Sequence, residues 1–477
     1  MRFLLSKQNF RFQSTEYSLR VVICLDIHGK KTEYTHTTEI MPLCRNSKEL
    51  NSENTIFDLL PFEEGRWATM NEGVQILSIY KIDDNWSQAS YTTIVDRCLQ
   101  IFKLNPFLMG SIIKPSTFKL MLKPSKLIPK NFVHEKVIDR KFFSGLTSYG
   151  EKCKIIGDFK VPNAGKAFKD DLNLAEFYVL RDNEDVQSAK NIAIILSTNH
   201  LIGDGCTMYN IFNMLDPNCQ PRTLDRTSVL YGKEIYKHTS LCGKNGKDTM
   251  MSDMFSTIAP MLMSAYGRSG NKKYTTQLYN FRINNEELNR VKEEYKDQEF
   301  PGSFVSTNDI LTSWLFTKNP KADFVQMAVD ARKRIPILEN DLAGNYLLLA
   351  YLRKTDLASP IACRKLVQKR TCNKTGKDYQ TMPTFSELRK YCGGISTNWS
   401  SFYKSFKLNG LDLVSQTPFF DQGLIGQRFM GMDTLCEDNI IIFKANDKET
   451  GVYIFTGSAK ISKEDLENDP MTNGRLI

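Results

Sequence analysis

Histidine is scarce in this sequence, with five among 477 residues. The five are His28, His36, His134, His200 and His238. The sequence contains no Cys-x-x-Cys pair, and no cysteine and histidine stand at the spacing of zinc ligands. We therefore expect no metal site, and any histidine chemistry must come from one of these few side chains.

Long apolar runs and dense basic tracts are also missing. No run approaches the roughly 18 apolar residues that a bilayer-spanning helix needs. The formal charge is modest, 63 − 54 = +9, and the densest basic run covers only residues 332–334. A nucleic-acid-binding surface normally has a longer stripe of lysine and arginine, so we expect neither a transmembrane segment nor a nucleic-acid partner. The charge suits attraction of a polyanionic small molecule such as a nucleotide-bearing cofactor, and solubility alone explains it equally well.

The eleven cysteines are scattered from Cys24 to Cys436 and are odd in number. This usage is typical of a reduced chain and predicts a cytoplasmic protein rather than a disulfide scaffold. The first twenty residues are basic and leave organellar import open as an alternative.

Hydrophobic periodicity predicts a mixed α/β protein. Residues 74–82 and 191–201 have the pattern of strands, and the second strand is apolar on both faces, which is typical of a central strand covered on both sides. Met208, Ile211 and Leu215 then repeat with the spacing of an amphipathic helix. Strands and helices follow one another without strict alternation, so we expect mixed sheets.

Changes in composition divide the sequence into four parts. We predict an N-terminal lead-in over residues 1–60 and a first subdomain over 61–215. A crossover over 216–273 carries a loop and a methionine cluster, and a second subdomain follows over 274–477. Helices of this second part are predicted to begin near residues 284, 306 and 462.

One histidine lies in a pattern that suits chemistry. His200 stands at the end of the predicted central strand, and Asp204 and Gly205 form the turn into the next helix, giving His-x-x-x-Asp-Gly. Side chains at such strand ends leave the sheet at a crevice. A neutral imidazole there can accept a proton from an alcohol or an amine. Asp204 could orient the imidazole or pair with an arginine, and the short turn favours the arginine pair.

The sequence resembles the superfamily of chloramphenicol acetyltransferase, the BAHD plant acyltransferases and the condensation domains of peptide synthetases. The resemblance starts from the His200 motif and extends, in the family's order, over about residues 60–475. The other matching segments are residues 105–108, 306–311, 329–334, 344–345 and 398–401. Asn199 stands where condensation domains carry a first histidine, and residues 406–410 differ from the BAHD Asp-Phe-Gly-Trp-Gly box, which indicates a divergent member.

The resemblance implies a fold and a mechanism. The implied fold is an α/β sandwich of two similar halves with mixed sheets, flanking helices and a tunnel between the halves, in a monomer. The implied mechanism is direct acyl transfer, with His200 as general base, Asp204 and Gly205 supporting the motif, and Arg332 as the partner of Asp204. The candidate donors to the oxyanion are Asn398, Trp399 and Ser400.

We accordingly expect an acyltransferase that takes an acyl group, such as acetyl, from acyl-CoA to a hydroxyl of a small, largely apolar, natural-product-like acceptor. Acyl-CoA would be a co-substrate rather than a permanent cofactor, and Lys333 and Arg334 would meet its phosphates. An amine acceptor and a carrier-protein-bound donor are alternatives within the same chemistry. A non-catalytic binding protein that keeps the fold is a further alternative.

Overall fold

The computed structural model divides the chain into two units, residues 1–52 and 53–477. It describes residues 13–15, 18–27, 30–39, 56–60, 63, 73–113, 119–123, 126–226, 277–299, 301–319, 324–332, 338–371, 392–419, 438–456 and 461–475. The first unit contains a three-stranded antiparallel sheet in the order β1-β2-β3. Its strands are β1 (Gln13–Thr15), β2 (Ser18–Ile27) and β3 (Lys30–Glu39).

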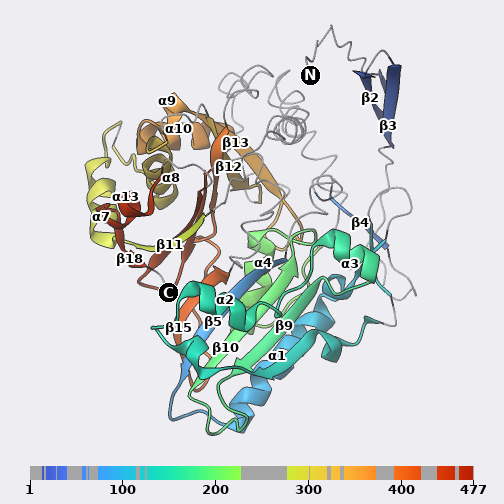
Figure 1. Cartoon of the computed structure of the whole chain (residues 1–477), viewed down its shortest axis with the longest axis vertical. Coiled ribbons are helices and arrows are strands. Elements are labelled where there is room, and N and C mark those ends of the chain that lie inside the picture. Colours follow the sequence, from blue (N-terminus) through green and yellow to red (C-terminus); the bar gives the residue numbers. More distant parts are fainter. Residues whose placement is uncertain are drawn as a thin grey trace. The chain divides into compact units, whose positions relative to one another are not determined.

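The first large sheet of the second unit has five strands in the order β15-β5-β10-β9-β8. Their bounds are β5 (Gly73–Ile82), β8 (Val133–Val137), β9 (Ala175–Arg181), β10 (Asn191–Asn199) and β15 (Leu411–Phe419). Only the β8–β9 pair is parallel, and the other pairs of this sheet are antiparallel. The strands β15, β5, β10 and β9 are labelled in Figure 1. The strands predicted near residues 74–82 and 191–201 are thus present.

β10 lies in the middle of this sheet and is covered on both faces, as its sequence predicts. Ile194 packs in a cluster with side chains of α1 (Gln88–Leu104). Its neighbour Ile195 points to the opposite face and packs in a cluster with side chains of α2 (Tyr149–Ile156). A strand that is buried from Ile192 onward therefore leads to the residues that follow Asn199.

The second large sheet has seven strands in the order β13-β12-β14-β16-β17-β11-β18. Their bounds are β11 (Gln277–Ile283), β12 (Phe324–Asp330), β13 (Leu347–Arg353), β14 (Cys392–Asn398), β16 (Asp438–Lys444), β17 (Thr450–Thr456) and β18 (Thr472–Arg475). β14 pairs in parallel with both β12 and β16, whereas the remaining pairs are antiparallel. The prediction of mixed sheets is confirmed.

Helices against the second sheet begin where the sequence predicts. They are α7 (Asn285–Glu294), α8 (Thr307–Thr317) and α13 (Lys463–Glu467). Two further helices, α9 (Lys354–Leu357) and α10 (Pro360–Thr371), were not predicted from the sequence. The Ser306 hydroxyl accepts a hydrogen bond from the backbone N–H of Asp309, whose carboxylate accepts from the backbone N–H of Ser306. This reciprocal capping fixes the start of α8.

A third, small sheet contains β4 (Ile56–Asp58), β6 (Ser111–Ile113) and β7 (Lys119–Met121) in the order β4-β7-β6. Leu59, which follows β4, packs in the same cluster as Ile194. Residues of the predicted lead-in 1–60 therefore occur both in the first unit and in the core of the second.

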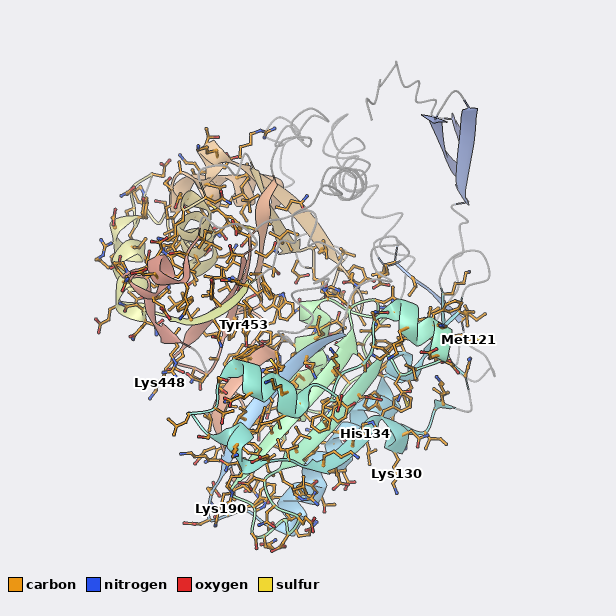
Figure 2. All side chains as sticks on the ribbon, in the orientation of Figure 1. Met121, Lys130, His134, Lys190, Lys448 and Tyr453 are labelled. Atoms are coloured by element: carbon orange, nitrogen blue, oxygen red, sulfur yellow. The ribbon has the colours of Figure 1, made fainter. Side chains whose placement is uncertain are left out.

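The two halves of the second unit are joined by strand β15 and by one hydrophobic cluster with side chains from both. β15 follows β14 in sequence but pairs with β5, so the later half of the chain completes the first sheet. Tyr149 of α2 lies against Phe419 of β15 and Tyr453 of β17, with ring centroids 5.0 and 5.8 Å apart; Tyr453 is labelled in Figure 2. The boundaries at residues 215 and 274 stay predictions, because most of the predicted crossover lies outside the described residues.

Within the described ranges, none of the helices combines the length and apolarity needed to cross a membrane. In the same ranges, no group of three or more histidine, cysteine, aspartate or glutamate side chains could hold a metal ion. The methionine cluster predicted near residues 250–263 lies outside the described residues.

Burial on both faces of β10 predicts a large effect of truncation. Ile194→Ala should lower the free energy of unfolding by about 2–5 kcal/mol, because it leaves a cavity between β10 and α1. Val137→Ala is the control: this side chain lies on the edge strand β8 and is 44% exposed, so the loss should stay within about 0.5 kcal/mol. Urea unfolding followed by circular dichroism measures both, and equal losses would contradict the assignment of β10 as a buried strand.

Candidate functional site

The turn that presents His200 begins two residues earlier than its sequence predicts. β10 ends at Asn199, because the Asn199 side-chain oxygen accepts a hydrogen bond from the backbone N–H of Leu201 at 2.9 Å. The Asn199 amide nitrogen donates to the main-chain oxygen of Pro162 at 2.7 Å. This local turn competes with the sheet ladder and directs the chain out of the sheet at His200.

The next helix, α4 (Gly205–Phe212), is capped by Asp204. An oxygen of the Asp204 carboxylate accepts hydrogen bonds from the backbone N–H and the hydroxyl of Thr207, at 2.9 and 3.0 Å. Aspartate is a favoured residue at this position, where it satisfies an amide of the first helical turn and complements the positive end of the helix dipole. The number of residues between His200 and Gly205 is thus set by the end of β10 at Asn199 and the start of α4 at Gly205.

Arg332, directly after β12, holds the Asp204 carboxylate from the second half of the chain. Its two terminal nitrogens lie 2.8 and 3.2 Å from the two Asp204 oxygens. The same guanidinium donates to Asp330 at 2.9 Å and to the main-chain oxygens of Leu342 and Gly344, both at 2.9 Å. The Arg332 side chain has no exposed surface. This planar, bidentate arrangement is one that arginine makes and lysine cannot.

Both oxygens of the Asp204 carboxylate accept hydrogen bonds from this network. Its second oxygen also accepts the backbone N–H of Tyr346 at 3.0 Å. Burial alone would raise the pKa of Asp204, but the charge and hydrogen bonds of Arg332 and the bonds from Thr207 outweigh burial and hold the pKa below its usual value. The structure thus places Arg332 against Asp204, as the resemblance implies. The Asp204 carboxylate lies in a buried ion pair of the fold.

Burial lowers the pKa of His200. Its main-chain carbonyl, the charge of Asp204, the side chain of Asn345 and the charge of Glu63 act in the opposite direction with smaller effect. The imidazole is therefore neutral at neutral pH, which is the form that can accept a proton. The described residues place no hydrogen-bond partner on its Nδ1 atom.

Glu63 and Arg226 form a second buried ion pair beside His200, which the sequence did not reveal. Nη1 of Arg226 lies 3.4 Å from Oε1 of Glu63, and it also donates to the main-chain oxygen of Ile202 at 2.9 Å. Asn345 links this pair to the motif: its amide nitrogen donates to Glu63 at 3.0 Å and to the main-chain oxygen of His200 at 2.8 Å. Glu63 and Arg226 are far apart in sequence and lack a local pattern, so only the fold could identify them.

The three predicted oxyanion donors occupy the end of β14 and the turn after it. The indole of Trp399 lies against Gly205, where a Cβ atom would approach it to 2.8 Å, and its N–H donates to the hydroxyl of Thr397 at 3.1 Å. The Ser400 hydroxyl donates to the side-chain oxygen of Asn398 at 2.7 Å. Trp399 thus touches the motif turn, and the role of each of the three residues stays a prediction.

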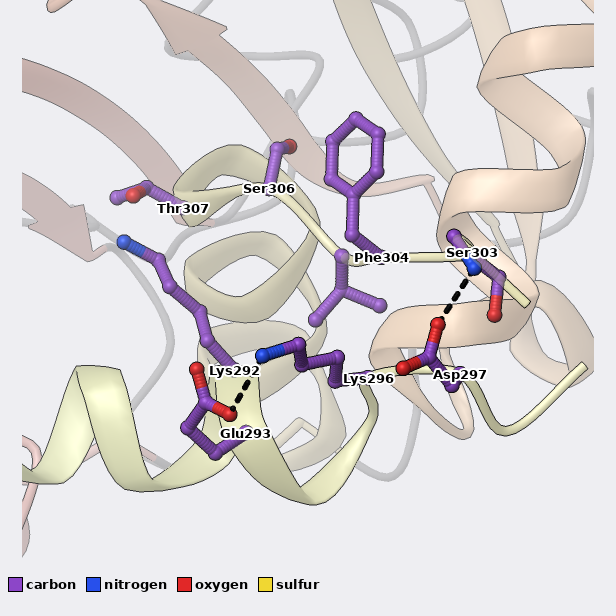
Figure 3. Close-up of a pocket in the computed structure, with 10 residues that line it drawn as sticks. Lys292, Glu293, Lys296, Asp297, Ser303, Phe304, Ser306 and Thr307 are labelled. Atoms are coloured by element: carbon purple, nitrogen blue, oxygen red, sulfur yellow. Dashed lines mark hydrogen bonds and ion pairs between the residues drawn. The ribbon is translucent and has the colours of Figure 1, made fainter. Parts of the chain in front are cut away.

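Lys333 and Arg334, predicted to meet the phosphates of coenzyme A, lie outside the described residues. A groove of about 550 Å³ lies elsewhere in the second half, beside α7 and the start of α8 (Figure 3). Lys292, Lys296 and Phe304 are among the residues that line it. No residue of the His200 motif lines this groove, so it is separate from the site described above.

Several solved structures have the same architecture. The structure of F. sporotrichioides TRI101 complexed with coenzyme A and T-2 aligns with a TM-score of 0.54 over 87% of this chain and 97% of that chain, at 13% identity. TRI3 trichothecene 15-O-acetyltransferase from Fusarium sporotrichioides aligns with a TM-score of 0.53 over 88% of this chain and 94% of that one, at 11% identity. The condensation domain of the Monacolin K polyketide synthase MokA aligns with a TM-score of 0.51 over 86% and 94%, at 9% identity.

The chain has the fold of these proteins. This confirms the α/β fold that the resemblance implies, in a chain whose sequence has diverged far from its structural neighbours. No protein-family model matches the sequence, and no curated protein sequence matches it. The likeness is therefore visible in the arrangement of strands and helices rather than in overall sequence.

The Asp204–Arg332 pair predicts a strong dependence of stability on Arg332. Arg332→Ala should lower the free energy of unfolding by about 3–5 kcal/mol, because it leaves a buried carboxylate without its counter-charge. Arg290→Ala is the matched control, since Arg290 also contacts two carboxylates but its side chain is 61% exposed; it should leave stability nearly unchanged. Urea unfolding compares the two variants, and a similar small effect of both would contradict a structural role for the buried pair.

Proposed function

We propose that this chain is an acyltransferase that moves an acyl group from acyl-CoA to a hydroxyl of a small, largely apolar acceptor. The proposal is supported by the fold that the chain shares with a trichothecene acetyltransferase and with TRI101, whose structure was solved with coenzyme A. Fold alone does not assign an activity. The site must therefore carry the argument.

One observation carries it: a buried, neutral imidazole stands at a strand end, and the nearby motif carboxylate is bound by an arginine. His200 is buried at 7% exposure, and Asp204 is held by Arg332 at 2.8 Å. Because the carboxylate is occupied, the imidazole is not paired as it would be in a serine-protease triad. His200 is thus suited to take a proton directly from a substrate.

The proposed reaction is one transfer without an acyl-enzyme. His200 accepts the proton of the acceptor hydroxyl while the hydroxyl oxygen forms a bond to the thioester carbonyl carbon. The carbonyl oxygen becomes an oxyanion, which then re-forms the carbonyl as the carbon–sulfur bond breaks. The imidazolium returns its proton to the leaving thiolate, so the histidine ends in its starting form.

A donor to the oxyanion is required at this site. The candidates are Asn398, Trp399 and Ser400, and two of them already use their donor groups in other hydrogen bonds. The Trp399 N–H donates to the Thr397 hydroxyl, and the Ser400 hydroxyl donates to the side chain of Asn398.

We propose that Lys333 and Arg334 meet the phosphates of acyl-CoA, because both are cations within two residues of the anchored Arg332.

A second reaction of the same chemical class is favoured by one of the structural neighbours. The condensation domain of MokA shares the fold, so a carrier-protein-bound acyl group or an amine acceptor would fit the same histidine chemistry. Acyl-CoA remains our proposed donor, since Asn199 replaces the first of the two histidines typical of condensation domains. We further propose a monomeric, cytoplasmic enzyme that uses natural-product-like acceptors.

Replacing His200 tests the function. His200→Ala should reduce acyl transfer from acetyl-CoA to a panel of alcohols and amines by about 100-fold or more, because the general base is lost. His134→Ala is the matched control: His134 lies on β8 outside the motif, half-buried and 3.5 Å from Glu176, and its replacement should leave transfer unchanged. Thiol release and product mass measure the reaction, and circular dichroism verifies folding.

Two results would contradict this function. Unchanged transfer by folded His200→Ala would exclude His200 as the base. Absence of transfer by the wild-type chain from acetyl-CoA and from an acylated carrier protein, across the panel, would favour a binding protein that keeps the fold.

The pH profile tests the protonation state. Because burial lowers the pKa of His200, the imidazole should be neutral and active at pH 7. The rate should fall on acidification, with its midpoint below the ordinary histidine pKa of about 6.5, since the protonated imidazole cannot accept a proton. A plot of log kcat/KM against pH measures the midpoint, and a midpoint clearly above 6.5 would contradict this environment for the base.

A further inference from the structure

One surface of the second unit carries a large share of the exposed apolar side chains. We call it the α3 surface, and it consists of the small sheet, helix α3 (Ala164–Asp170) and their flanking residues, namely 56–58, 111–113, 119–123, 126–130 and 164–172. Eight large apolar side chains are exposed among the described residues, and four of them belong to this surface: Ile56, Ile128, Phe168 and Leu172. Single exposed apolar side chains are ordinary, but a gathering of them marks an interaction site.

The outer face of the small sheet forms one part of this surface. Ile56 of β4 pairs directly with Met121 of β7, so both side chains lie on one face, whereas the neighbouring Leu120 is buried in the core on the other face. Ile56 is 51% exposed, which identifies its face as the outer one. Helix α3 packs against β6, the neighbour of β7, and Met121 is labelled beside this helix in Figure 2.

Ion pairs attach the segment after β7 to the end of α3. The ammonium groups of Lys123 and Lys126 lie 3.1 and 3.0 Å from carboxylate oxygens of Asp171, the residue that ends α3 in a left-handed conformation. Ile128 follows two residues after Lys126, and Leu172 follows Asp171. Exposed apolar side chains therefore stand on both of the segments that these ion pairs join.

Helix α3 is amphipathic, and its outer side mixes apolar and basic groups. Ala164 and Ala167 are buried in the core, whereas Lys166, Phe168 and Lys169 are exposed. The helix thus presents a phenylalanine between two lysines to solvent. Lysine side chains can keep their charge in a polar layer while their stems lie along an apolar one.

The charge of the α3 surface is positive and comes from lysine alone. It has a formal charge of +3, from six lysines and three aspartates, and it contains no arginine. Arginine is the usual side chain for specific binding of phosphate or carboxylate groups, and protein interfaces are enriched in arginine and depleted in lysine. Lysines combined with exposed aliphatic groups therefore fit a diffuse negative surface with an apolar layer beneath it.

We propose that the α3 surface docks on an anionic lipid bilayer. The side chains of Ile56, Phe168 and Leu172 enter the boundary between head groups and acyl chains, and the lysines face the anionic head groups. Stable attachment to a membrane needs two signals, and this surface supplies an apolar and a basic one. The inference goes beyond the proposed function, and docking would bring the chain to the phase in which a largely apolar acceptor dissolves.

Co-sedimentation of the full chain with lipid vesicles tests the proposal. Vesicles of phosphatidylcholine with about one quarter phosphatidylserine should bind the chain about 10-fold or more tightly than vesicles of phosphatidylcholine alone, because each lysine near an anionic surface adds to the attraction. A higher salt concentration should weaken this binding, because salt screens the charges.

A pair of charge reversals tests the basic part of the surface. Lys166→Glu combined with Lys169→Glu should weaken binding to the anionic vesicles by about 10-fold or more, since two attractions become repulsions. Lys190→Glu combined with Lys448→Glu is the matched control: both lysines are exposed, the net charge changes equally, and Figure 2 labels both far from Met121. The control should bind within about twofold of the wild type, because charges beyond a Debye length are screened.

A second pair tests the apolar part. Phe168→Ser combined with Leu172→Ser should weaken vesicle binding by about 10-fold or more, because less apolar surface enters the lipid. Leu146→Ser is its control: this side chain is 96% exposed in the loop before α2, so it would have the larger effect if any exposed apolar group served. Circular dichroism verifies folding, and the lysine pair decides the question if the apolar variant does not fold.

Three results would overturn the proposal: no binding to the anionic vesicles, equal binding to both kinds of vesicle, or an equal loss in the test and control variants. The last result would mean that overall charge or general stickiness, and not the α3 surface, causes the binding. Acyl transfer to a water-soluble alcohol should be unchanged in all of these variants, because none alters the His200 site. Vesicle binding needs no turnover, so failure of the proposed function and failure of this proposal are read separately.

Discussion

The site depends on the ion pair between Asp204 and Arg332, which joins residues 128 positions apart in the sequence. Asp204 caps α4, and Arg332 follows β12 of the other large sheet, so the pair binds the two halves together at the residues that present His200. Both charges are removed from water, so each is tolerated only while the other is present. The geometry of the His200 turn is thus coupled to correct packing of the second half.

The Glu63–Arg226 pair adds a second constraint of the same kind, linked to His200 through Asn345. Asn345 lies between the two networks: its side chain reaches Glu63, and the neighbouring Tyr346 N–H reaches Asp204. The neighbouring residues Asn345 and Tyr346 therefore contact both carboxylates. The position of the imidazole therefore depends on packing between several elements and not on one loop alone.

Local features of the fold and site were predictable because their causes lie close together in sequence. The apolar faces of β10 and the capping box of Ser306 and Asp309 follow directly from residue spacing. The partnership of Arg332 with Asp204 followed from resemblance. Glu63 and Arg226 could not be recognised, since a single acid and a single arginine at distant positions look like ordinary surface residues. The end of β10 at Asn199 also differs from the prediction, because a side-chain hydrogen bond competes with the ladder.

The exchange of β15 between the halves has a consequence for synthesis of the protein. Ile82 of β5 pairs with Leu411, so the first sheet gains its last strand only after most of the chain has left the ribosome. Until then the edge of β5 offers unpaired backbone groups to any other strand, which is a hazard for aggregation. A chain truncated before β15 would carry the whole His200 motif but leave β5 at the edge of the sheet. The first sheet is therefore complete only when the later half of the chain is present.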